Sequence, residues 1–294
     1  MNETADCSGM RGKTVLITGA DGGIGRHTVQ GIALQGAHVI MACIDARKAG
    51  PVRDEISWQT RNEHIDVMQL DLASQDGIRR FAAEFTTGHE ILDVLINNAG
   101  VFSLQRLETE DGLERTIGVN YFGHYLLTHL LLPLLRKAGR ARIINVASNA
   151  YKQASLDQDD LQTRSGYTGM KAYSLSKLAV ILFTQELAER LRATGITANA
   201  VHPGHAATGI WNMWEHPAWY QRCALMLMRL FLLPPEQAAA ASVYLACSDE
   251  VDGVSGTYFS QQKPAAVRSK YATIAARKKL WSISRELTRA EWEF

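Results

Sequence analysis

Residues 13–25 read KTVLITGADGGIG, an apolar run of strand-forming residues that passes directly into a glycine-rich turn. A helix is predicted to follow over residues 24–35. Its first turn would present unpaired N–H groups and a partial positive charge to an anion. Strand, glycine loop and helix in this order are typical of the first turn of a dinucleotide-binding fold, where a pyrophosphate binds. The alternative is a tight turn with a structural role alone.

The same alternation of short apolar strands and longer helical patterns continues along the chain. We predict an α/β fold with a single doubly wound parallel sheet, Rossmann-like, and helices on both faces. One domain is expected over 1–294, with a polar N-terminal tail at 1–12 and a C-terminal extension at 265–294 that is helical from about residue 267. Further strands are predicted at 37–43, 64–72, 91–100, 141–148, 195–204 and 256–260, and further helices at 106–138, 170–193 and 235–247.

Composition excludes several classes of partner. The 294 residues carry 31 basic and 30 acidic side chains, a formal net charge of +1 that gives no electrostatic basis for binding nucleic acid. No uninterrupted apolar run reaches the length of a membrane span, and residues 1–12 lack an apolar signal core. The four cysteines lie far apart, which predicts no metal site, reduced thiols and a cytoplasmic location.

Polar or glycine residues stand at successive strand ends, where ligands bind in doubly wound sheets. Asp71 and Leu72 end the third strand, and an aspartate there can accept a hydrogen bond from an adenine amino group. Ser148 ends the fifth strand. Taken singly, such clusters are usually turns, so their recurrence is the informative observation. The remaining strand-end residues are Asn98, Ala99, Gly100, Pro203 and Gly204.

Two tyrosine–lysine pairs have the same spacing of four residues, which places both partners on one face of a helix. They are Tyr167 with Lys171 and Tyr173 with Lys177. Gly169 lies inside the first pair and weakens a helix by about 1 kcal/mol relative to Ala. We therefore expect Tyr167 in the loop or first turn before the helix, and Tyr173 and Lys177 on the helix itself.

Together these motifs resemble the short-chain dehydrogenase/reductase family. The matching pieces are TGADGGIG (18–25), NNAG (97–100), Asn120 in VNYFGHYLL (119–127), Ser148 in INVAS (144–148), AYSLSK (172–177) and HPG (202–204). The C-terminal part, including MLMRLFLLPPEQAAAASVYLA (226–246), is similar to the retinol dehydrogenase-like branch. The resemblance implies hydride transfer between a nicotinamide cofactor and an alcohol or carbonyl.

The resemblance also implies roles for individual residues. Tyr173 would be the general acid/base, its pKa lowered by Lys177 and the nicotinamide charge. Ser148 would hold the substrate oxygen, and Asn120 would position a water in a proton relay. For Asn120 the alternative is a structural residue bonded to a backbone carbonyl. The predicted cofactor-binding residues are Gly19, Asp21, Gly23, Ile24, Gly25, Asp45, Asp71, Leu72, Asn98, Ala99, Gly100, Tyr173, Lys177, Pro203 and Gly204.

The choice between NAD(H) and NADP(H) depends on the end of the second strand. Asp45 there would bind the ribose 2′-hydroxyl and repel a 2′-phosphate, which favours NAD(H). Ile44 stands where the similar relatives carry an arginine. Arg26 and Arg47 could instead attract a 2′-phosphate. The alternative for Asp45 is the N-cap of the next helix.

An apolar segment at 205–234 falls where this family builds its substrate lid. Trp211, Trp214 and Trp219 predict a lipophilic alcohol or carbonyl substrate, retinoid-, steroid- or polyketide-like. Core packing or peripheral contact with a membrane are the alternatives. Apolar helices at 113–137 and 175–183 predict a homodimer or homotetramer, unless they pack within the chain. Rival functions are a catalytically silent dinucleotide-binding sensor and an epimerase or dehydratase of the same family.

Overall fold

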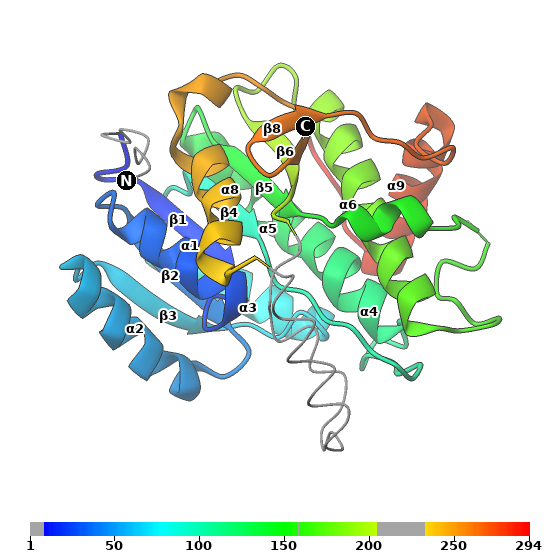
Figure 1. The fold of residues 1–294 in the computed structure, drawn as a ribbon, viewed down its shortest axis with the longest axis horizontal. Helices are drawn as coiled ribbons and strands as arrows, with labels where there is room; N and C mark the ends of the chain where they lie inside the picture. Colours follow the sequence, from blue (N-terminus) through cyan, green and yellow to red (C-terminus); the bar gives the residue numbers. More distant parts are fainter. Residues whose placement is uncertain (1–8, 158, 205–232) are drawn as a thin grey trace.

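The N-terminal strand–loop–helix unit is present as β1 (Thr14–Thr18) and α1 (Gly23–Ala33). The computed structural model describes residues 9–157, 159–204 and 233–294. Its sheet has eight strands in the order β3-β2-β1-β4-β5-β6-β7-β8, which confirms the Rossmann-like fold (Figure 1). The other strands are β2 (His38–Cys43), β3 (Ile65–Gln69), β4 (Val94–Asn97), β5 (Arg142–Val146), β6 (Thr197–His202), β7 (Tyr258–Ser260) and β8 (Lys263–Ala265).

Helices cover both faces of the sheet because alternate strand residues point in opposite directions. Val15 and Ile17 of β1 pack into the cluster that includes α1, α2 (Ala46–Thr60) and α8 (Pro235–Cys247). Leu16, between them, joins the opposite cluster. The helices there are α3 (Gln75–Gly88), α5 (His124–Lys137), α6 (Gly169–Arg190) and α9 (Ile274–Thr288). Short 3₁₀ turns lie at Asn149–Gln153 and Asp249–Val251.

The predicted helix at 106–138 is wrong over its first nine residues. Residues 106–114 form a loop closed by an isolated bridge between Glu108 and Glu114. Helical structure starts where the buried Glu114 carboxylate accepts hydrogen bonds from the N–H groups of Thr116 and Ile117. It continues as α4 (Arg115–Ile117), a π-helical turn (Gly118–Gly123) and then α5.

The C-terminal extension also differs from expectation. Residues 263–265 form β8, which pairs antiparallel with β7, so the sheet is not parallel throughout. Helix α9 begins at Ile274 rather than near residue 267, and Thr273 caps it by accepting from the N–H of Ala276. The predicted lid falls almost entirely on residues 205–232, which lie outside the described residues, as do residues 1–8.

The apolar helices behind the oligomer prediction are covered by the C-terminal segment of the same chain. Trp281 of α9 stacks on Phe183 of α6, with ring centroids 6.0 Å apart, and meets Tyr125 of α5 edge-on at 5.2 Å. The Arg190 guanidinium lies 4.4 Å from the Trp281 ring centroid. The alternative of packing within the chain therefore accounts for these apolar faces. A homodimer or homotetramer remains a prediction.

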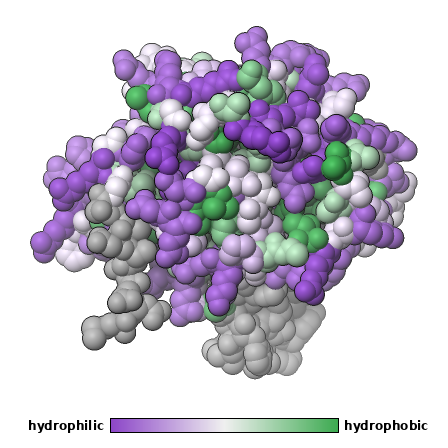
Figure 2. Space-filling model, turned by 90° about the horizontal axis from the view of Figure 1, so that it is seen from above, coloured by the Kyte–Doolittle hydropathy of each residue, from purple (hydrophilic) through white to green (hydrophobic). Residues whose placement is uncertain are grey.

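Hydrophobic residues on the molecular face drawn in Figure 2 are scattered among hydrophilic ones rather than gathered in one broad patch. Within the described ranges, no helix combines the length and apolar character needed to cross a bilayer.

Candidate active site

A cavity of about 480 Å³ lies at the carboxyl ends of the parallel strands, as the sequence predicts. Asn120 and Asp45 are not among the described residues that line it. All the other predicted site residues line it: Gly19, Asp21, Gly23, Ile24, Gly25, Asp71, Leu72, Asn98, Ala99, Gly100, Ser148, Tyr173, Lys177, Pro203 and Gly204.

The glycine loop leaves the start of α1 open to this cavity. Gly22 is the N-cap of α1 and offers no side-chain cap, and the first turn carries no acidic side chain. Gly19 has a φ of +61°, and a Cβ on Gly25 would lie 2.0 Å from the Gly19 carbonyl oxygen. The loop therefore presents uncapped N–H groups at a helix N-terminus, an arrangement that fits the pyrophosphate of a dinucleotide.

A buried hydrogen-bond chain holds this loop against the end of β4. The Thr18 hydroxyl accepts from the N–H groups of Asn98 and Ala99 at 2.9 and 3.0 Å. With both lone pairs engaged, Thr18 donates its proton to His124 Nε2, 2.9 Å away. His124 Nδ1 in turn donates to the Asn120 carbonyl oxygen at 3.2 Å.

Thr18 and His124 did not appear among the predicted site residues. Burial lowers the pKa of His124 to about 4, so its ring is neutral at physiological pH. The available signal was the spacing of four residues between Asn120 and His124, which places the histidine ring against the preceding helical turn.

Tyr173, Lys177 and Ser148 converge on the same cavity. Burial raises the pKa of Tyr173, and a hydrogen bond with the Ser148 side chain opposes that shift. Lys177 is 3% exposed, and its Nζ donates to the Val146 carbonyl oxygen at 2.9 Å and lies 5.7 Å from the centroid of the Tyr173 ring. Burial lowers the pKa of Lys177 to about 8. The expected lowering of the tyrosine pKa by the lysine is therefore not seen in the protein alone.

The rival pair lies elsewhere. Thr168 caps α6 by accepting from the N–H of Lys171, so Tyr167 precedes the helix, as predicted. The Tyr167 hydroxyl donates to the Ser103 carbonyl oxygen at 3.0 Å, and Lys171 Nζ donates to the Ser165 carbonyl oxygen at 2.8 Å. Both side chains serve local structure, and neither is among the described residues lining the cavity.

Asn120 lies in the π-helical turn, with its amide engaged at both ends. Its Oδ1 accepts from the N–H of Val101 at 2.7 Å, and its Nδ2 donates to the Val101 carbonyl and to Ser176 Oγ, both at 3.0 Å. These contacts match the structural alternative for Asn120 and join the NNAG turn to α6. They do not test the proton relay.

At the end of β2, the side chain of Asp45 turns to its own helix. Its carboxylate accepts hydrogen bonds from the N–H groups of Arg47 and Lys48, and these bonds lower its pKa. Asp45 is thus the N-cap of α2, and Ile44 lines the cavity in its place. This geometry matches the N-cap alternative for Asp45, and its role in cofactor binding remains a prediction.

Asp21 lines the cavity and lies near Cys43, at the end of β2. Burial, together with the charge of the nearby Asp21 carboxylate, raises the pKa of the Cys43 thiol to about 12. Of the two arginines that could attract a 2′-phosphate, Arg26 forms an ion pair with Glu55. Neither Arg26 nor Arg47 is among the described residues that line the cavity.

Comparison with known proteins agrees with this geometry. The model of the family described as short chain dehydrogenase matches residues 13–218. The chain belongs to the short-chain dehydrogenase family. Retinol dehydrogenase 13 of Homo sapiens is 42% identical to this dehydrogenase, over 95% of this chain and 86% of its own. Retinol dehydrogenase 14 of Mus musculus is 41% identical, over 94% of this chain and 85% of its own.

Solved structures support the same assignment. An uncharacterized protein from Mycobacterium Paratuberculosis has a TM-score of 0.78 and 32% identity, covering 97% of this chain and 96% of its own. RhlG of Pseudomonas aeruginosa, solved with NADP, has a TM-score of 0.67 and 25% identity, covering 86% of this chain and 96% of its own. The 3-ketoacyl-(acyl-carrier-protein) reductase of Brucella melitensis, solved with NADH, has a TM-score of 0.66 and 25% identity, covering 85% of this chain and 97% of its own. This dehydrogenase is an NAD(P)-dependent oxidoreductase that interconverts an alcohol and its carbonyl.

Proposed function

We propose that this dehydrogenase acts on a lipophilic, retinoid-like alcohol or aldehyde, with Tyr173 as the general acid/base. The observation that carries the proposal is the meeting of Tyr173, Ser148 and Lys177 in the cavity that the glycine loop opens onto. A steroid-like or polyketide-like substrate would use the same groups.

The bound nicotinamide supplies or accepts the hydride, and the chain supplies the proton and the positioning. When a carbonyl is reduced, the Tyr173 phenol donates its proton to the substrate oxygen as negative charge develops there. When an alcohol is oxidised, the phenolate removes the hydroxyl proton. Ser148 holds the substrate oxygen, and Lys177 stabilises the phenolate. Burial raises the pKa of Tyr173, so in the protein alone this side chain is a phenol that can donate its proton to a carbonyl oxygen.

Two observations support a lipophilic substrate. The sequence from 208 to 233 is rich in tryptophan, methionine and leucine, and it follows the HPG motif at the cavity edge. Two relatives about 40% identical carry the name retinol dehydrogenase. A nucleotide-sugar epimerase or dehydratase would need mainly polar groups for its sugar, whereas apolar side chains outnumber polar ones in this segment.

For the cofactor we propose a preference for NAD(H), on different grounds from the predicted ones. Asp21, not Asp45, places a carboxylate on the cavity wall, beside Cys43. Ile44 occupies the neighbouring wall with an uncharged side chain that is 62% exposed. A 2′-phosphate would meet negative charge there, and neither Arg26 nor Arg47 is among the described residues that line the cavity.

Turnover with a panel of retinoid, steroid and medium-chain alcohols and aldehydes tests the proposal. Tyr173→Phe should lower kcat by about 100-fold or more while binding of NADH persists, since only the acid/base is removed. Tyr167→Phe, the matched control, should retain activity. Binding of NADH without turnover on any substrate would favour the silent sensor. Activity on a UDP-sugar alone would favour the epimerase.

Three broader properties remain proposals. They are a single domain over 1–294, a homodimer or homotetramer, and a cytoplasmic location with possible peripheral membrane contact. Light scattering of the purified protein would test the oligomeric state, and subcellular fractionation would test the location.

A further inference from the structure

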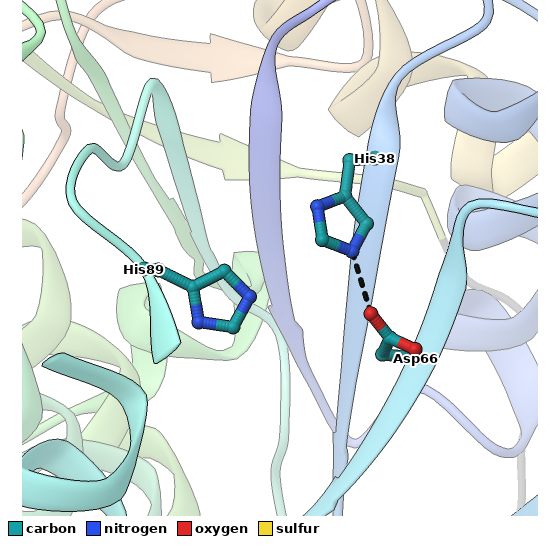
Figure 3. Close-up of side chains that lie close together, drawn as sticks. All are labelled: His38, Asp66 and His89. Carbon is teal, nitrogen blue, oxygen red and sulfur yellow. Dashed lines mark hydrogen bonds and ion pairs between the residues drawn. The ribbon is translucent and has the colours of Figure 1, made fainter. Parts of the chain in front are cut away.

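Three side chains from separate elements lie close together near the amino ends of β2 and β3 (Figure 3). The cavity lies at the opposite, carboxyl ends of the strands. His38 is the first residue of β2, Asp66 is near the start of β3, and His89 follows directly after α3. One ligand atom from each lies within 4.8 Å of the others. Their positions in the sequence match no metal-binding motif, which is why the sequence predicts no metal.

His89 is held in the form that binds a metal ion. Its Nδ1 lies 3.1 Å from the Phe85 carbonyl oxygen, and a carbonyl can only accept, so Nδ1 carries the proton. Its Nε2 then has a lone pair, and Figure 3 shows that nitrogen on the side facing His38. Stacking on Phe85, with ring centroids 4.3 Å apart, fixes the ring orientation. A backbone carbonyl on the outer nitrogen is the usual support for a metal-binding histidine.

His38 and Asp66 complete the ligand set. The His38 Nε2 lies 2.6 Å from Asp66 Oδ2, and the side chains are 33% and 60% exposed. Metal–ligand bonds near 2.0 Å place tetrahedral ligand atoms roughly 3.3 Å apart, so rotation of partly exposed side chains is enough to open this pair and close the gap to His89. An ion would displace the proton between His38 and Asp66, and water would complete its coordination.

We propose that His38, Asp66 and His89 bind a zinc ion that fastens β2, β3 and the end of α3 together. Two imidazoles and one carboxylate suit Zn²⁺ and its first-row neighbours, whereas Mg²⁺ and Ca²⁺ take sets of oxygen ligands. The site is separate from the proposed catalytic groups, so its zinc stabilises the fold and takes no part in hydride transfer.

The test is a titration of the metal-free full-length protein with Zn²⁺ in competition with a chromophoric chelator, together with the Zn²⁺-induced shift of Tm. His38→Gln, His89→Gln and the double variant are compared with His64→Gln. This control removes a neighbouring histidine, whose ring centroid is 6.4 Å from that of His38, and leaves the three ligands intact. Binding of NADH by each variant verifies that it is folded.

We expect wild type to bind one more Zn²⁺ per chain than the double variant. Each single variant should lower the affinity for that ion by about tenfold or more, and His64→Gln should leave the affinity unchanged. Zinc held elsewhere in the chain would remain in the double variant. Equal stoichiometry and affinity in wild type and double variant would overturn the proposal. If a histidine variant does not fold, Asp66→Asn at the same exposed site gives the same comparison.

Discussion

Lys177 brings an ammonium group into a position with almost no contact with water, and the fold is destabilised in return. Burial lowers its pKa from the ordinary 10.5 to about 8, because the charged form loses its hydration. The proposed chemistry needs that charge beside the Tyr173 phenolate. Residues that serve catalysis at the expense of stability are expected at such sites.

Lys177→Met should therefore stabilise the protein and abolish turnover. Removing the buried charge should raise the free energy of unfolding at pH 7 by about 2 kcal/mol, after allowing for the lost hydrogen bond to Val146. The folded-state pKa is lowered, so the penalty is full below pH 8, shrinks as pH rises, and vanishes above about 10.5. Urea unfolding of both proteins at several pH values measures this; a gain that grew with pH would contradict it.

Where the cavity wall passes the end of β2, a single residue should control the choice between NADH and NADPH. Ile44→Arg adds a cation to the cavity wall and should strengthen NADPH binding by about tenfold or more, through charge-assisted contacts with the 2′-phosphate. NADH binding should change little. Parallel fluorescence titrations with both cofactors give the ratio, and Arg47→Ala, outside the described cavity lining, is the control. An unchanged ratio would place the 2′-hydroxyl elsewhere.

At the scale of elements, the glycine loop depends on a close contact between its two ends. A Cβ on Gly25 would meet the Gly19 carbonyl oxygen and the Asn98 side chain, whereas one on Gly22 would meet nothing within 4 Å. Gly25→Ala should therefore lower the free energy of unfolding by about 1–3 kcal/mol and weaken NADH binding. Gly22→Ala should leave Tm unchanged. Thermal unfolding of both variants without cofactor separates this steric effect from a ligand clash.

The same loop shows which parts of the site the sequence can predict. Gly19, Gly23 and Gly25 are constrained by local geometry, so their pattern identifies the turn, and the strand ends follow because parallel strands share one edge. Asp45 could cap a helix or bind ribose, and no local pattern decides between them. The Thr18–His124 bond joins residues 106 positions apart and has no sequence signature.

At the scale of the whole molecule, α9 and the residues after it complete the core. Trp281 is 4% exposed, and it packs on helices that the sequence left open to an oligomer. The edge strand β8 was likewise missed, because three residues that include Pro264 carry no strand signal of their own. Long-range packing of this kind decides what the apolar helices contact, and periodicity alone cannot reveal it.

Trp281→Ala should destabilise the protein by about 3–5 kcal/mol, because it leaves a cavity between α5, α6 and α9. Uncovered apolar surface should also make the variant self-associate. Trp58→Ala, which truncates a tryptophan that is 82% exposed on α2, should do neither. Urea denaturation and light scattering measure both effects. A loss of stability below about 1 kcal/mol would show that α9 is not part of the cooperative core.

Because α9 seals α5 and α6, the order of synthesis matters for folding. The ribosome makes α6, which ends at Arg190, well before α9, which begins at Ile274. At translation rates of about 5–20 residues per second, the two helices wait on the order of ten seconds for their cover. During that interval the apolar faces of α5 and α6 are exposed on the nascent chain, where chaperones can bind them. A ribosome stalled between α6 and α9 would prolong that exposure.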